Sequence, residues 1–187
     1  MTKNIPTPTN PAQLDKVLFE FQTRLKDNLS WLDYACGRVI EHEHNNNGKI
    51  LPKIYIGDDR YVEVMPDASL GNYCFFDVGE KRQVLKHMPG RGMLVKCTFG
   101  LVIWFNLSKI YPMAVERKTE DLQQEIVDVL VRKTSLSCAG FLITGITDNA
   151  KQVFGKYAGK NPESKYMMHP YGAFRFDGEL IYNTAAV

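Results

Sequence analysis

The chain is organised around the apolar run Leu94-Val95-Lys96-Cys97-Thr98-Phe99-Gly100-Leu101-Val102-Ile103-Trp104-Phe105-Asn106-Leu107. Every second residue of this run is apolar, namely Val95, Cys97, Phe99, Leu101, Ile103, Phe105 and Leu107. The residues between them are mixed in character, so one face of the segment is apolar and the other is partly polar. This period of two predicts a long central β-strand.

A helix is predicted after a short connection. The segment 119–133 places apolar residues at Leu122, Ile126, Val129 and Leu130, which is helical spacing. Thr119 suits the cap, and acidic residues in the first turn and basic residues in the last turn match the helix dipole. A strand followed by a helix that packs on its apolar face indicates an α+β domain. We expect a mixed or antiparallel sheet carrying this helix and one N-terminal helix.

Length, composition and charge limit the classes of protein to which this chain can belong. A chain of 187 residues that is 44% apolar is an ordinary globular chain with a sizeable core. The formal charge of +2 argues against a general electrostatic hold on nucleic acid, although a local basic patch remains open. The sequence holds no apolar run long enough for a membrane helix and no secretory signal is expected. The four scattered cysteines predict a reduced chain rather than a disulfide framework.

The N-terminal part is expected to hold a flexible arm and a helix. Residues 1–11 are rich in Thr, Asn and Pro and predict the arm, so that residues 12–187 form one α+β domain. The helix is predicted from the apolar series Leu14, Val17, Leu18, Phe21, Leu25, Leu29 and Leu32. Thr9 or Asn10 would cap it, Pro11 would take its first position, and it would end near Ser30 or continue to Val39.

Strands are predicted at 50–57 and 61–65, joined by a turn at 57–60, and then at 73–78, 141–146 and 174–182. The last strand alternates apolar and charged residues, which places it at a sheet edge. Two extended loops are expected. The segment 79–92 is basic and exposed, with solvent or DNA as its neighbour, and the segment 148–168 carries four lysines and is long for a compact domain.

Catalytic motifs are missing from the sequence: we find no phosphate-binding glycine loop, paired CxxC, HExxH or GxSxG. The polar segment 41–48 contains His42 and His44, which could bind a divalent metal but are explained as well by a solvated loop. Asp58 and Asp59 fall in a predicted turn, and His169 lies beside a proline. The chain is therefore expected to be neither an enzyme nor a cofactor-binding protein.

Four motifs resemble a phage family. They are Leu29-Ser30-Trp31-Leu32-Asp33-Tyr34-Ala35-Cys36-Gly37-Arg38, Met65-Pro66-Asp67 with Gly71-Asn72-Tyr73-Cys74-Phe75-Phe76, Leu101-Val102-Ile103-Trp104-Phe105-Asn106-Leu107, and Met168-His169-Pro170-Tyr171-Gly172-Ala173-Phe174-Arg175-Phe176. With the order of elements, these resemble neck-ring and tail-terminator proteins of tailed bacteriophages, and more closely virion proteins of crAss-like and other Bacteroidales phages. The first motif reads WLDxAFGR in the related chains, so Cys36 stands where Phe is usual, which loosens one packing contact.

The resemblance implies a structural protein of the virion that assembles in the cytoplasm of the bacterial host. Subunits would form a ring of about six or twelve copies in the head–tail connector, joined by one patch meeting a different patch. Its partners would be itself, the portal and adjacent neck and tail ring proteins. Genomic DNA would pass through the lumen without sequence-specific binding, and no membrane is involved.

The alternatives are a nucleic-acid-binding accessory protein and a metal-assisted hydrolase using His42, His44, Asp58 and Asp59.

Contacts between subunits are expected from the terminal arm, the two extended loops and the densely packed segment around Trp31. The candidate residues are Trp31, Tyr34, Arg38, Lys81, Arg82, Lys86, Arg91, Trp104, Lys151 and Lys156. Trp104 lies on the partly polar face of the central strand. It would be covered either by a neighbouring subunit or by the N-terminal helix of its own chain.

Overall fold

The computed structural model describes residues 11–44, 49–67, 69, 71–113, 116, 118–131, 138–154, 157, 166 and 168–185. Its helices are α1 (Gln13–Asn28), α2 (Leu107–Ile110), α3 (Thr119–Val131) and α4 (Ala150–Val153). Its strands are β1 (Tyr34–Arg38), β2 (Ile40–His44), β3 (Lys49–Gly57), β4 (Arg60–Glu63), β5 (Tyr73–Met88), β6 (Gly92–Asn106), β7 (Gly140–Thr147) and β8 (Tyr171–Asn183). The expected α+β class is confirmed. The predicted N-terminal arm lies almost entirely outside the described residues.

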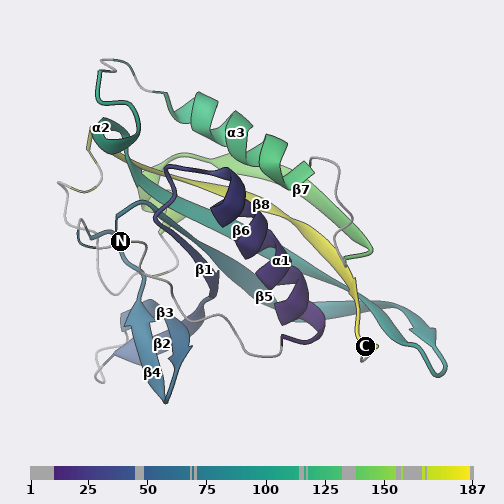
Figure 1. The fold of residues 1–187 in the computed structure, drawn as a ribbon. Coiled ribbons are helices and arrows are strands. Elements are labelled where there is room, and N and C mark those ends of the chain that lie inside the picture. Colours follow the sequence, from purple (N-terminus) through teal and green to yellow (C-terminus); the bar gives the residue numbers. More distant parts are fainter. Residues whose placement is uncertain are drawn as a thin grey trace.

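The main sheet has five strands in the order β1-β5-β6-β8-β7 (Figure 1). β1 runs parallel to β5, and the other three pairs are antiparallel. The sheet is therefore mixed, as expected. The prediction that the last strand lies at an edge was wrong, because β8 pairs with β6 on one side and β7 on the other. Its charged residues instead form ion pairs across the sheet face.

Two ends were predicted for the first helix, near Ser30 and at Val39, and the structure matches the shorter one. α1 ends at Asn28, and the chain then turns into β1, so continuation to Val39 was wrong. The backbone N–H groups of Asp33 and Tyr34 donate to the carbonyl of Asn72 at 2.9 and 3.1 Å, which draws this segment alongside β5. The cap was also predicted wrongly: Ala12 holds the N-cap position and makes no side-chain cap hydrogen bond.

One core cluster lies between the main sheet and the two longer helices. The apolar face of the central strand is buried throughout, and α1 and α3 cover it in Figure 1. Phe21 of α1 contacts both Phe76 and Phe141, with ring centroids 6.2 and 4.9 Å apart. Leu122, Ile126 and Leu130 of α3 belong to the same cluster as the apolar face of β6, which confirms the predicted packing of the central helix against the strand. The segment following α3 at 132–137 lies outside the described residues.

A second core cluster lies on the opposite face of the same sheet. Trp104 is 1% exposed there and stacks between Tyr73 and Tyr171, with centroid distances of 5.6 and 5.3 Å. Its indole N–H donates to the carbonyl of Tyr166 at 3.1 Å. Both expectations for Trp104 were therefore wrong: residues of its own chain cover it, and they lie on the side away from α1.

The small sheet β2-β3-β4 contributes to this second cluster through Leu51 and Ile54. Its β3–β4 hairpin confirms the prediction, with Asp58 and Asp59 in a turn at positive φ of 50° and 56°. Residues 41–44, expected in a loop, instead form β2, because they pair in antiparallel register with β3. Residues 45–48 and the side chains of His42 and His44 lie outside the described residues.

The expected loop at 148–168 is described only in part. It begins with the short helix α4, and three of its apolar residues, Val153, Phe154 and Tyr157, are buried in the second cluster. This part of the segment therefore packs on the sheet and is not an extended loop. The residues at 155–156 and 158–165 lie outside the described residues, as do the side chains of Lys151 and Lys156.

Candidate assembly surface

The segment Gly79–Gly92 forms a hairpin that projects from the main sheet, which we call the distal hairpin. Its prediction as a loop was wrong, because β5 and β6 remain paired as far as Met88 and Gly92. Pro89 and Gly90 occupy the turn, where Gly90 has φ of +71° and the N–H of Arg91 donates to the carbonyl of Met88 at 2.8 Å. A Pro-Gly pair with positive φ at the glycine is typical of a type II turn.

The distal hairpin is exposed on both faces, as predicted for the segment. In Figure 1 it continues past the end of β8, whose last pair joins Asn183 to Leu94. Every residue from Glu80 to His87 is exposed, including Val84 at 54% and Leu85 at 42%. The four basic residues of the hairpin are Lys81, Arg82, Lys86 and Arg91. The hairpin is therefore a basic surface with an apolar centre.

The outer edge of β5 is unpaired along the distal hairpin. β1 pairs with β5 only from Tyr73 to Phe76, and the N–H of Val39 makes one further bond to the carbonyl of Phe76 at 2.8 Å. Beyond Phe76, no described strand lies along this edge. Two irregularities in register, between Val78 and Arg82 and between Val84 and Lys86, bend the strand. No described strand pairs with the outward-facing backbone donors and acceptors of β5 beyond Phe76.

β7 forms the opposite edge of the main sheet. It pairs with β8 on one side and with no described strand on the other. Its sequence, Gly-Phe-Leu-Ile-Thr-Gly-Ile-Thr, contains neither a charge nor a proline. Leu142 and Ile146 are 58% and 52% exposed. Natural edge strands usually carry charges or proline that discourage pairing, and β7 carries only an irregularity between Ile143 and Gly145.

A charged network covers part of the sheet face between these edges. The guanidinium of Arg175 donates to Asp77 at 2.7 Å and to Asp177 at 2.6 Å. Burial lowers the pKa of Arg175, but the bonds to the two carboxylates outweigh burial and leave that pKa raised. The guanidinium lies over Gly100, where a Cβ atom would come within 2.3 Å of it. Nearby, Lys96 pairs with Glu179 at 3.0 Å.

The candidate contact residues are distributed unevenly. Lys81, Arg82, Lys86 and Arg91 come together on the distal hairpin. Trp31, Tyr34 and Arg38 are only partly exposed and lie before or within β1, and the indole N–H of Trp31 donates to Glu125 of α3 at 2.9 Å. Trp104 is buried within its own chain and is not a surface residue.

Asn72 was not singled out from the sequence, although it joins three segments of the chain. Its side chain donates to the carbonyl of Trp31 at 2.9 Å and accepts from the N–H of Asn106 at 2.8 Å. Its own N–H donates to the carboxylate of Asp33 at 2.7 Å. Gly71 has φ of +71°, and a Cβ atom there would lie 2.4 Å from the same carboxylate.

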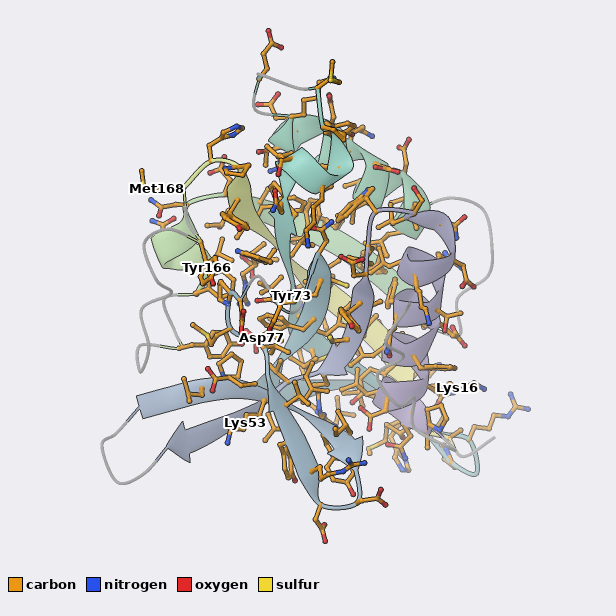
Figure 2. The ribbon with its side chains drawn as sticks, turned by 60° about the vertical axis from the view of Figure 1, so that its left-hand side comes forward. Lys16, Lys53, Tyr73, Asp77, Tyr166 and Met168 are labelled. Carbon is orange, nitrogen blue, oxygen red and sulfur yellow. The ribbon has the colours of Figure 1, made fainter. Side chains whose placement is uncertain are left out.

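This set of bonds, which we call the Asn72 clamp, includes residues from three of the motifs that carry the phage resemblance. The fourth motif adjoins it, since the N–H of Leu107 donates to the carbonyl of Pro170 at 2.8 Å. Asn72 itself is 3% exposed. The motifs are therefore spread along the sequence but adjacent in the fold, and they fix where strands begin and end. Figure 2 shows the neighbouring Tyr73 and Asp77 near the middle of the molecule.

The features of the described residues that bear on chemistry are the possible metal ligands, the cysteine thiols and a groove. Within the described ranges, no group of three or more His, Cys, Asp or Glu residues could hold a metal ion. The four cysteines are free, and burial raises the pKa of Cys74 to about 12, so its thiol is protonated near neutral pH. A groove of about 440 Å³ between α1 and α3 is lined by Asn28, Asp121, Gln124, Glu125, Asp128 and Val129.

No described helix is long and apolar enough to cross a membrane.

No protein-family model matches this chain, and no curated protein matches it either. The resemblance to phage neck proteins therefore rests on the quoted motifs. The two open sheet edges and the distal hairpin form the candidate assembly surface.

Proposed function

We propose that the chain is a structural virion protein whose copies form a ring in the phage head–tail connector, between portal and tail. The observation that supports this most is the pair of unlike open edges on one sheet. A closed ring requires a patch on each subunit that meets a different patch on the next. The free edge of β5 and the uncharged edge of β7 are two such patches, at opposite ends of the strand order.

The charge distribution is consistent with a subunit around a DNA channel. The formal charge of the whole chain is only +2, so the sliding genome meets no general electrostatic hold. The basic residues of the distal hairpin are local, and they suit either a neighbouring protein or transient contact with phosphate. The partners in this proposal are further copies of the chain, the portal and the adjacent neck and tail rings.

The location in the virion tests this proposal. An epitope inserted at the exposed Asp58–Asp59 turn lies on the small sheet, away from both open edges, and exposed turns tolerate insertions. Gold-labelled antibody should then mark the junction of head and tail in electron micrographs of tagged virions. Label spread over the capsid or along the whole tail would contradict a neck position.

A nucleic-acid-binding accessory protein is the second candidate, and the observation that favours it is the basic distal hairpin. Lys81, Lys86 and Arg91 are exposed and close in sequence. Binding through phosphate contacts falls steeply as salt is raised. The measurement is the affinity of the purified chain for duplex DNA at several salt concentrations. Strong, salt-dependent binding that Lys81→Glu/Lys86→Glu abolishes would favour this candidate over the ring.

A further inference from the structure

We propose that the β7 edge of one subunit pairs, as an antiparallel strand, with the free edge of β5 in the distal hairpin of the next subunit. This inference rests on the proposed ring and names the contact that would build it. The main sheet would then continue from subunit to subunit. Three features of the two edges support this contact: their direction, their level in the sheet and the side chains that they expose.

The direction of the strands suits a head-to-tail contact. β5 is antiparallel to β6, β6 to β8, and β8 to β7. Three reversals leave β7 running opposite to β5. A second copy, placed beside the first by rotation about an axis roughly along the strands, therefore presents its β5 antiparallel to β7. No strand has to change direction, and the same operation can be repeated until the ring closes.

The two edges also lie at the same level of the sheet. One row of paired residues across the sheet runs Gln83, Lys96, Ile181 and Gly140. A second row runs Val78, Phe99, Gly178 and Ile143. The first half of β7 is therefore level with the stretch of β5 between Val78 and Gln83, where pairing with β1 has already ended. A sideways neighbour would bring the two free stretches together without a large shift along the strands.

The side chains at the two edges are complementary. β7 exposes the apolar residues Leu142 and Ile146, and the free stretch of β5 that is level with Leu142 exposes the basic residue Lys81. Exposed apolar residues on an uncharged edge strand favour pairing with another chain. The sheet beside β7 carries Asp177 and Glu179, whose side chains are 44% and 39% exposed and are bonded to Arg175 and Lys96 respectively. Together with Asp77, these are three carboxylates against the two cations Arg175 and Lys96, so the group has a net charge of −1, which suits the basic hairpin of a neighbour.

Cross-linking between two engineered thiols tests the contact. The full-length double variant Lys81→Cys/Leu142→Cys is prepared with Cys138→Ser. Lys81 lies between Val78 and Arg82, in the stretch of β5 that is level with Leu142, and Cys138 is the native cysteine that is not fully buried. The oligomer is treated with a short bis-maleimide. A ladder of covalent multimers is expected from the double variant. Each single variant, treated identically as a control, should give no multimers beyond background, because it offers only one side of the contact.

The outcomes separate the two proposals. A chain that sediments as a monomer at every concentration overturns self-assembly and this inference together. An oligomer that gives no ladder overturns the inference alone and leaves the ring in place. Cross-linked dimers from the single Leu142→Cys variant would show a symmetric β7–β7 contact, which also overturns the inference.

A charge on the edge provides an independent test. Leu142→Lys introduces a positive charge where the basic hairpin of the neighbour is expected, so the assembly should dissociate at least tenfold more readily. Leu142→Glu removes the same apolar contact but attracts the hairpin, and its effect should be smaller. Tyr55→Lys is the matched control, because Tyr55 is 48% exposed on β3, the central strand of the small sheet. Equal sensitivity of all three variants would overturn the proposed contact.

Discussion

The two halves of β5 differ sharply in their exposure to solvent. From Tyr73 to Asp77 every residue is buried, whereas from Glu80 to His87 every residue is exposed. The first half lies between the helix cluster on one face and the Trp104 cluster on the other. The second half extends past both layers. A single strand thus belongs to the core at one end and to the surface at the other.

The difference shows that one part of a strand can stabilise the fold while another part of the same strand is left for contact with a neighbouring subunit. Residues between two layers contribute apolar burial, which is the main favourable term in folding. Residues in the exposed half contribute little to the folded monomer, because an isolated pair of strands is at best marginally stable. We therefore expect substitutions in the first half to change stability and those in the second half to change assembly.

The largest effect is expected from truncating a side chain in the buried half. Phe75 is fully buried, so Phe75→Ala should lower the free energy of unfolding by about 4 kcal/mol. Val84→Ala in the same strand is the matched control, and it should change that free energy by less than about 0.5 kcal/mol. Urea unfolding measures both. Similar losses in the two variants would contradict the division of β5.

A slightly smaller loss is expected where the buried half meets the charged network. Asp77 is 5% exposed, and Arg175→Met would remove its ion-pair partner while the carboxylate stays buried. The free energy of unfolding should fall by about 3 kcal/mol. Adding Asp77→Leu to Arg175→Met should restore part of the loss, because no buried charge remains. A double variant no more stable than the single one would argue against a buried-charge effect.

The Asn72 clamp should give a loss of about 2 kcal/mol. Asn72→Ala leaves the N–H of Asn106 and the carbonyl of Trp31 without their side-chain partner in the fold. Thermal unfolding followed by circular dichroism measures the effect. Asn28→Ala is the control, because Asn28 makes its bond to Arg24 at an exposed position. A loss no greater than that of the control would mean that the clamp is not needed to join the three segments.

The smallest effect on stability is expected from charge reversal in the exposed half. Lys81→Glu/Lys86→Glu should change the free energy of unfolding by less than about 0.5 kcal/mol, since both side chains are exposed. Arg82 is left in place because its side chain bonds to Tyr182. The same double variant should reduce assembly, measured by sedimentation velocity. If the variant with reversed charges assembled fully, the two lysines of the distal hairpin would have no role in assembly.

Local patterns explain which elements the sequence predicted. Alternation along Val95–Leu107 and the spacing of apolar residues in α1 and α3 arise from burial of one face, so the pattern identifies the element. The distal hairpin is exposed on both faces and has no such pattern, and its charges and Pro-Gly turn resemble those of a loop. β2 is polar and becomes a strand through its pairing with β3.

Contacts between distant segments could not be predicted from local patterns. Trp104 is covered by Tyr73, Tyr166 and Tyr171, and nothing near it in sequence indicates this. The position of β8 inside the sheet depends on β7 pairing beyond it. The clamp brings Trp31, Asn72 and Asn106 together through backbone groups, which leave no compositional signal. The two unlike edges of the sheet are likewise a consequence of the strand order, which local sequence patterns do not specify.

The central claim is that this chain is a minor structural component of a virion, built into one ring. Quantitative mass spectrometry of gradient-purified virions, with this chain counted against the major capsid protein, tests it most directly. We predict a small, fixed copy number of about six or twelve per particle. Hundreds of copies would make the chain a capsid or tail-tube protein, and its absence from purified virions would contradict the structural role altogether.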